Sequence, residues 1–183
     1  MAIYGQRYKV QTRKGSTMAG SSSAAARMPF GRLGDAAQLK RFASAFGLSP
    51  RPVIAGREIF DPLYGKLPAR FPPLFEQLVT GFAWEEETDL GPLRLLANPP
   101  GSDLSGLEAA IFRDSGLIEG LRPTGLLLFA LGPDGTSDPV CFDSERRRSD
   151  RDCPIVLVRL REAAEVVEEI FPSFRALIER LAG

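Results

Sequence analysis

Apolar residues at helical spacing begin after Asp35. Hydrophobic side chains recur there at intervals of three and four, which places them on one helix face and predicts an amphipathic helix. The residues on that face are Leu39, Phe42, Ala43 and Phe46. Asp35 is the expected N-cap, and Gly47 is the expected stop because glycine readily ends a helix.

A second helix is predicted to begin at Pro72 or Pro73. Proline favours the first helical position, where its missing N–H costs nothing. The apolar positions of this helix are Leu74, Phe75, Leu78 and Val79. The helix is expected to end before Gly81.

A strand, a turn and a third helix are predicted next. Residues 91–97 read Gly-Pro-Leu-Arg-Leu-Leu-Ala, which is typical of a strand, and 98–101 read Asn-Pro-Pro-Gly, which is typical of a turn. Asp103 or Ser105 is then expected to cap a helix that runs through Phe112.

The middle of the sheet is predicted from an unbroken apolar run at Leu126–Ala130. This run lies between Gly125 and a Gly-Pro-Asp-Gly turn, so we expect a central strand that is buried on both faces. Further strands are predicted at Pro139–Asp143 and Pro154–Leu160. The last two are separated by the charged loop Ser144–Asp152, and three successive strands indicate an antiparallel meander.

The end of the chain shows two more amphipathic pieces separated by Pro172. We expect both to be helical, with a break or kink at the proline. Their apolar positions are Ala163, Val166, Val167 and Ile170 before the proline, and Phe174, Leu177, Ile178 and Leu181 after it. Helices, then strands, then helices predict one α+β domain over residues 35–183, with an antiparallel or mixed sheet flanked by helices.

Composition supports one core and separates the first 34 residues from the rest. The chain has 183 residues, of which 44% are hydrophobic and 25% charged, as in ordinary globular domains. Lys+Arg and Asp+Glu both total 23, but residues 1–34 hold six bases and no acid, leaving 17 bases and 23 acids elsewhere. We therefore expect residues 1–34 to be a disordered basic leader. An organelle transit peptide is the alternative, since such leaders are also basic and poor in acids.

The residue inventory excludes many kinds of chemistry. The sequence has no histidine and only two cysteines, which removes histidine-dependent catalysis and four-cysteine metal sites. No phosphate-binding glycine motif, secretory signal or run of about 20 apolar residues is present. We expect no enzyme activity, no cofactor or metal, no membrane association and a cytoplasmic location. Cys141 and Cys153 would be buried thiols, or a bridge across the loop between their strands.

An acidic segment beside the single tryptophan is the candidate partner-binding site. It consists of Trp84, Glu85, Glu86, Glu87 and Asp89. Tryptophan often supplies much of the binding energy of an interface, and the acids would attract a basic surface. A metal site and a solvated loop beside a core tryptophan are the alternatives.

The strongest basic run, Arg146–Arg148, does not indicate nucleic acid. The neighbouring acids Glu145, Asp150 and Asp152 bring the segment close to neutrality, and no aromatic residue is interleaved for base stacking. A charged hairpin loop is the expected role, and we expect no nucleic-acid partner.

Four segments resemble the SUKH superfamily, which includes the yeast Smi/Knr cell-wall regulators and bacterial immunity proteins for polymorphic toxins. The resemblance is strongest over residues 60–183. The segments are Leu67-Pro68 with the helix at Phe75–Val79; the strand Gly125–Ala130; Asp138–Asp143; and Cys153–Val158 followed by Pro172–Leu177. The resemblance implies a SUKH-like domain that binds a protein at the edge and in the cleft of its sheet, without catalysis.

These observations together predict a non-catalytic protein-binding module. The resemblance implies an immunity-type protein that neutralises a bacterial toxin encoded nearby. A stand-alone regulatory or scaffold protein of the Smi/Knr type, and a small-ligand binder on the same fold, are the alternatives. The sequence leaves the oligomeric state open.

Overall fold

The computed structural model describes residues 33–52, 56, 58–133, 138–160 and 164–183. The predicted leader, residues 1–34, lies outside these ranges except for its last two residues, and so does Ala163. The helices are α1 (Leu33–Ala45), α2 (Asp61–Tyr64), α3 (Pro73–Gly81), α4 (Ser105–Ile111), α5 (Ser115–Leu121) and α6 (Phe174–Ala182), with short 3-10 turns at Glu58–Phe60 and Arg122–Thr124. The strands are β1 (Ser49–Pro50), β2 (Phe82–Ala83), β3 (Thr88–Asp89), β4 (Arg94–Leu95), β5 (Leu126–Leu131), β6 (Pro139–Asp143), β7 (Ile155–Leu160) and β8 (Ala164–Phe171).

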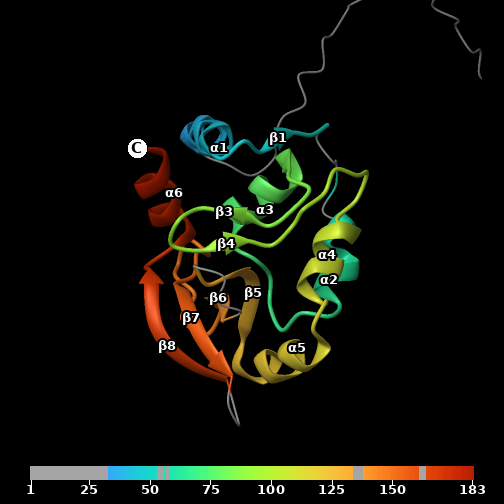
Figure 1. The fold of residues 1–183 in the computed structure, drawn as a ribbon, viewed down its shortest axis with the longest axis vertical. Coiled ribbons are helices and arrows are strands. Elements are labelled where there is room, and N and C mark those ends of the chain that lie inside the picture. The colour runs from blue at the N-terminus through green and yellow to red at the C-terminus, as the bar shows by residue number, and fades with distance from the viewer. Residues whose placement is uncertain (1–32, 53–55, 57, 134–137, 161–163) are drawn as a thin grey trace, which may run out of the picture.

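The main sheet is an antiparallel meander. Its six described strands lie in the order β3-β4-β5-β6-β7-β8, so that each pairs with its neighbour in sequence, and β1 and β2 form a separate antiparallel pair. Figure 1 shows α1 and α6 next to each other at one end of the sheet and α5 beside β5 at the other. The α+β class and the antiparallel sheet flanked by helices are therefore confirmed.

The predicted central strand is confirmed. Residues Leu126–Ala130 of β5 are all buried, and β5 pairs with β4 on one side and β6 on the other. Phe129 stacks on Phe142 of β6 with ring centroids 4.0 Å apart. Phe75 of α3 and Phe174 of α6 meet Phe142 edge-on at 5.3 and 5.7 Å. An aromatic cluster thus joins the sheet to both helices.

The predicted helix before Pro172 is wrong. Residues 164–171 form β8, which pairs antiparallel with β7 along its whole length. The spacing of Val166, Val167 and Ile170 suggested a helix, but two irregularities in the pairing break the usual alternation of a strand. Glu169 and Phe171 face successive residues of β7, and so do Val166 and Glu168, which leaves Ile170 and Val167 as the extra residues of β-bulges.

Smaller differences concern short elements. The strand expected at 91–97 is limited to β4. The helix α5 is not predicted by the sequence, because its residues, Ser-Gly-Leu-Ile-Glu-Gly-Leu, include two glycines and glycine disfavours helices. The structure holds α5 through its N-cap, where the Asp114 carboxylate accepts a hydrogen bond from the Leu117 N–H at 3.0 Å. The predicted helices at 35–46, 72–81 and 103–112 correspond to α1, α3 and α4.

Candidate functional site

The candidate site is the outer edge of β8. This strand is the last in the six-stranded sheet, and within the described residues no strand pairs with its other side. Figure 1 shows β8 on the outside of the molecule, with α6 at its C-terminal end. An edge strand presents backbone N–H and C=O groups that a further strand can pair with. At eight residues, β8 is longer than the average strand of about five to six.

The side chains of β8 combine acids with exposed apolar groups. Residues 165–169 are all exposed, and Val166 and Val167 have exposed fractions of 43% and 44%. Together with Leu160 at the end of β7, they are the only large hydrophobic residues classed as exposed in the described part of the chain. The acids of the same stretch are Glu165, Glu168 and Glu169.

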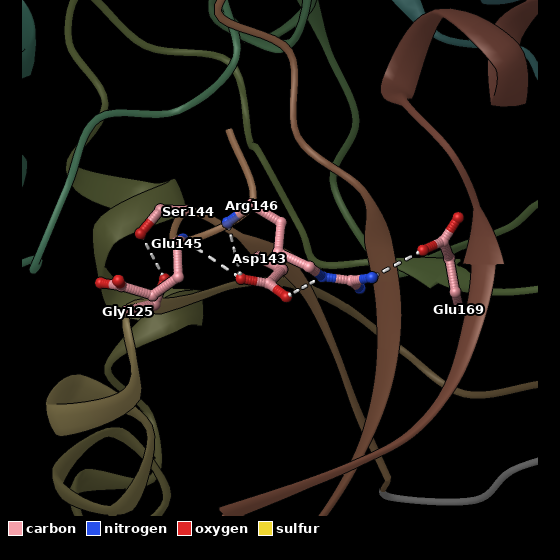
Figure 2. A network of polar contacts seen from close by, with 6 residues as sticks. All are labelled: Gly125, Asp143, Ser144, Glu145, Arg146 and Glu169. Atoms are coloured by element: carbon pink, nitrogen blue, oxygen red, sulfur yellow. Dashed lines mark hydrogen bonds and ion pairs between the residues drawn. The ribbon is translucent and has the colours of Figure 1, made fainter. Parts of the chain in front are cut away.

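A polar network holds the C-terminal part of β8 against the β6–β7 loop. The Arg146 guanidinium donates to the Asp143 carboxylate at 2.6 Å and to the Glu169 carboxylate at 2.9 Å, as Figure 2 shows. Asp143 also accepts the backbone N–H groups of Glu145 and Arg146, at 3.1 and 3.3 Å. Glu169 is therefore paired, whereas no ion pair within the described ranges engages Glu165 or Glu168.

Gly125 lies where this network meets β5. Its φ of 68° lies in the left-handed region that favours glycine. A Cβ at this position would lie 2.9 Å from a carboxylate oxygen of Glu145. The Ser144 hydroxyl and backbone N–H both donate to the Gly125 carbonyl, at 2.5 and 3.1 Å (Figure 2). The start of the β6–β7 loop is thereby tied to the sheet.

The sequence-predicted acidic segment is divided between the core and the surface. Trp84 is 6% exposed, and its indole N–H donates to the Leu96 carbonyl at 2.7 Å. The indole therefore lies in the core, where it cannot contact a partner without rearrangement. Glu85 and Glu86 are exposed, so they remain available to a partner.

The other two acids of that segment have local structural partners. Glu87 forms ion pairs with Arg94 at 3.3 Å and with Arg113 at 3.2 Å. Asp89 is exposed and accepts the Gly91 N–H at 2.7 Å, which closes the turn between β3 and β4. Substituting Glu87 would thus disturb the loop itself as well as the surface charge.

The two cysteines are free and buried. Burial raises the pKa of Cys153 to about 11 and also raises the pKa of Cys141. Because the thiolate is the nucleophile and the metal ligand, both thiols are held in their unreactive form. Within the described ranges, no three His, Cys, Asp or Glu side chains form a group able to hold a metal ion.

A cavity of about 420 Å³ lies between α1, α3 and β1. Arg51, which is 7% exposed, lines it and donates to the carbonyls of Asn98 and Pro99 at 3.0 and 2.9 Å. Its Nε is buried without a hydrogen-bond partner. Lys40 also lines the cavity, and the apolar wall is made by Leu39, Ala43, Leu48 and Phe82.

Comparison with known proteins returns no matching family model, no matching curated relative and no matching solved structure. The SUKH resemblance therefore rests on the sequence motifs alone. Among the described helices, none combines the length and apolar character that crossing a bilayer requires.

The sequence predicts a helix before Pro172, so β8 is not among the predicted strands. One strand signal was present, since Val166, Val167 and Ile170 are β-branched and such residues favour strands. The unpaired outer edge has no local signal, because it depends on which strands end the sheet.

Proposed function

We propose that this chain is a non-catalytic protein-binding module whose contact surface is the edge of β8. The observation that carries the proposal is the outer side of β8, an eight-residue strand with two exposed valines, with which no strand of the described residues pairs. Proteins commonly protect edge strands by shortening, covering, charging or bulging them. This edge is charged and carries two bulges, but it is neither short nor covered by a described strand, so a short stretch of it can still pair with another protein.

The immunity-type role comes from the SUKH resemblance. In this role, the partner is a toxin encoded next to the gene of this chain, and binding neutralises it. Co-expressing the neighbouring gene product with this chain should give a complex in size-exclusion chromatography and restore growth to cells that make the toxin. A Smi/Knr-type regulator would instead bind a protein that is not toxic.

Two outcomes would defeat this function. Turnover of a substrate by the purified chain would contradict the non-catalytic part. Growth arrest by the neighbouring gene product that this chain cannot relieve would contradict the immunity role. A control chain carrying Val166→Asp and Val167→Asp keeps the buried residues unchanged and should lose the complex, because it replaces the exposed apolar groups with further acids.

The cavity beside α1 favours small-ligand binding as a second candidate function. Arg51 and Lys40 bring positive charge to a mostly apolar lining that contains no acid among the described residues, which suits an apolar carboxylate. Native mass spectrometry of the purified chain should then show a bound small molecule that is lost in an Arg51→Met variant. A spectrum at the mass of the bare chain would contradict this candidate.

A further inference from the structure

We propose that β8 binds an extended segment of the partner in which basic residues alternate with apolar ones, and that this segment adds to the sheet as a seventh strand. The inference rests on the proposed function and names the chemistry of the partner. It follows from the charges, the exposed valines and the shape of this edge.

The charges of β8 select a basic partner. Glu165 and Glu168 are exposed and engage no ion pair within the described residues, while Glu169 already pairs with Arg146. Arg159 lies opposite Glu165 in the pairing of β7 with β8, so Glu168 is the acid with no base facing it across the strands. Opposite charges on neighbouring strands stabilise the pairing, and like charges oppose it. Lys or Arg side chains in an added strand would therefore lie beside the exposed carboxylates of β8 and stabilise the pairing.

The exposed valines require apolar residues in the same segment. Val166 and Val167 lie between the two unpaired acids in sequence, and each is more than two-fifths exposed. Side chains of a strand alternate between its two faces. In a segment of alternating Lys and Val, the lysines can therefore pair with the acids of β8 while the valines contact its exposed valines. This pattern distinguishes the proposed partner from a merely basic surface.

A second copy of this chain does not satisfy the edge in the register that brings the exposed valines of the two copies together. A two-fold axis between Val166 and Val167 would pair the two β8 strands antiparallel and place Glu165 of one copy opposite Glu168 of the other. Carboxylates would then face each other twice in the same short interface. The acids thus act against self-association, as charged edge residues do in many sheets.

The two bulges limit the footprint of the added strand. Val167 and Ile170 are the extra residues in the pairing with β7, and bulges bend a strand and increase its local twist. A long flat strand would not follow this edge, so we expect the added segment to be short.

The exposed acids should act mainly on the rate of association, because charge attraction raises that rate more than the final affinity.

The probe for this proposal is a fluorescein-labelled peptide of alternating Lys and Val, about eight residues long, titrated into the full chain. Three peptides serve as comparisons. One carries N-methyl groups on the backbone nitrogens of one edge, one has Glu in place of Lys, and one has the same composition with all Lys in one block. We expect the alternating peptide to bind, and the other three to bind at least tenfold more weakly.

Two charge-matched double variants locate the binding. Glu165→Lys with Glu168→Lys should lower the affinity for the alternating peptide tenfold or more. Glu85→Lys with Glu86→Lys changes the net charge equally at the loop before β3 and should alter binding by less than twofold. Glu165→Gln with Glu168→Gln supplies a milder change, with intermediate weakening, if the lysine variant fails to fold. Raising the salt concentration should weaken binding to the unsubstituted chain, because exposed charges are screened.

Several results would overturn strand addition. Equal binding of the N-methylated peptide would show charge attraction without backbone pairing, and loss of binding only in the Glu85 and Glu86 variant would move the site to that loop. A complex with the neighbouring gene product that the Glu165 and Glu168 variant leaves unchanged would defeat strand addition and leave the proposed function standing. Peptide binding with the expected selectivity but no protection against the toxin would defeat the immunity role alone.

Discussion

Phe129 is the side chain through which the aromatic cluster meets the central strand. It is 1% exposed, stacks on Phe142 at 4.0 Å and meets Phe75 edge-on at 5.4 Å. Buried aromatic pairs contribute beyond their buried area, and a void among them removes many contacts at once. The stability of the domain should therefore depend strongly on this residue.

We expect Phe129→Ala to lower the free energy of unfolding by about 3–5 kcal/mol, because the surrounding rings cannot collapse into the space left behind. Urea denaturation followed by circular dichroism measures the change. Val167→Ala on the exposed face of β8 is the control, with an expected change within about 0.5 kcal/mol. Equal midpoints for Phe129→Ala and the unsubstituted chain would contradict the packing described for β5.

The buried cysteines should be inert in the folded chain. With the pKa of Cys153 raised to about 11, only roughly a thousandth of that thiol is ionised at pH 8. An aromatic disulfide reagent should therefore label neither cysteine in native buffer, and should label both in guanidinium chloride. Labelling should become faster as the pH rises toward 11. Rapid native labelling at pH 8 would show that the sheet opens around Cys153.

At the scale of elements, α6 depends on a carboxylate that is distant in sequence. Asp152 is 6% exposed and accepts the N–H groups of Cys153, Phe174 and Arg175 at 2.9, 3.1 and 3.2 Å. The Ser173 hydroxyl accepts the Ala176 N–H at 3.1 Å as the N-cap. Two side chains thus accept the backbone N–H groups of the first turn of α6, and one of them comes from the loop before β7.

Asp152→Ala should destabilise the chain by roughly 2–3 kcal/mol, because it leaves buried backbone donors without acceptors. Ser173→Ala should cost about 1 kcal/mol, the usual loss for a helix cap. Thermal and urea unfolding provide both values. Ser149→Ala, at an exposed residue of the same loop, is the control with an expected change within about 0.5 kcal/mol. A larger loss for Ser149→Ala than for Asp152→Ala would contradict this account.

At the scale of the whole molecule, the described domain has one contiguous core. The buried cluster extends from Leu39 in α1 to Ile178 in α6 and includes Trp84. The ion pair between Asp35 and Arg175, at 2.9 Å, also joins the first helix to the last. A core shared by the first and the last described helix should unfold as one cooperative unit.

The only tryptophan of the chain reports on this cooperativity. Trp84 is buried at 6% exposure, so its fluorescence should shift to the red when the core opens. We expect the fluorescence midpoint in urea to coincide with the midpoint from far-ultraviolet circular dichroism, which follows the helices and strands throughout. Separate midpoints would show that α1, β1 and β2 unfold apart from the main sheet.

The sequence alone determined the elements whose signals are local. Leu126–Ala130 is an apolar run with a glycine before it, and Pro73 begins α3 with its apolar residues at helical spacing. The antiparallel meander followed from successive strand signals, and the α+β class followed from the order of the elements. In each case neighbouring residues carry the necessary information, because propensity, turns and caps act over a few positions.

The tertiary structure alone decided β8 and the surface around it. The spacing of Val166, Val167 and Ile170 is compatible with a helix, and residues 164–171 become a strand because the free edge of β7 supplies hydrogen-bond partners. The same long-range packing buries Trp84 and pairs Glu87 with Arg94 and Arg113. Which acids remain unpaired, and which edge stays open, depends on residues far apart in sequence, so hydrophobic spacing along the chain does not reveal it.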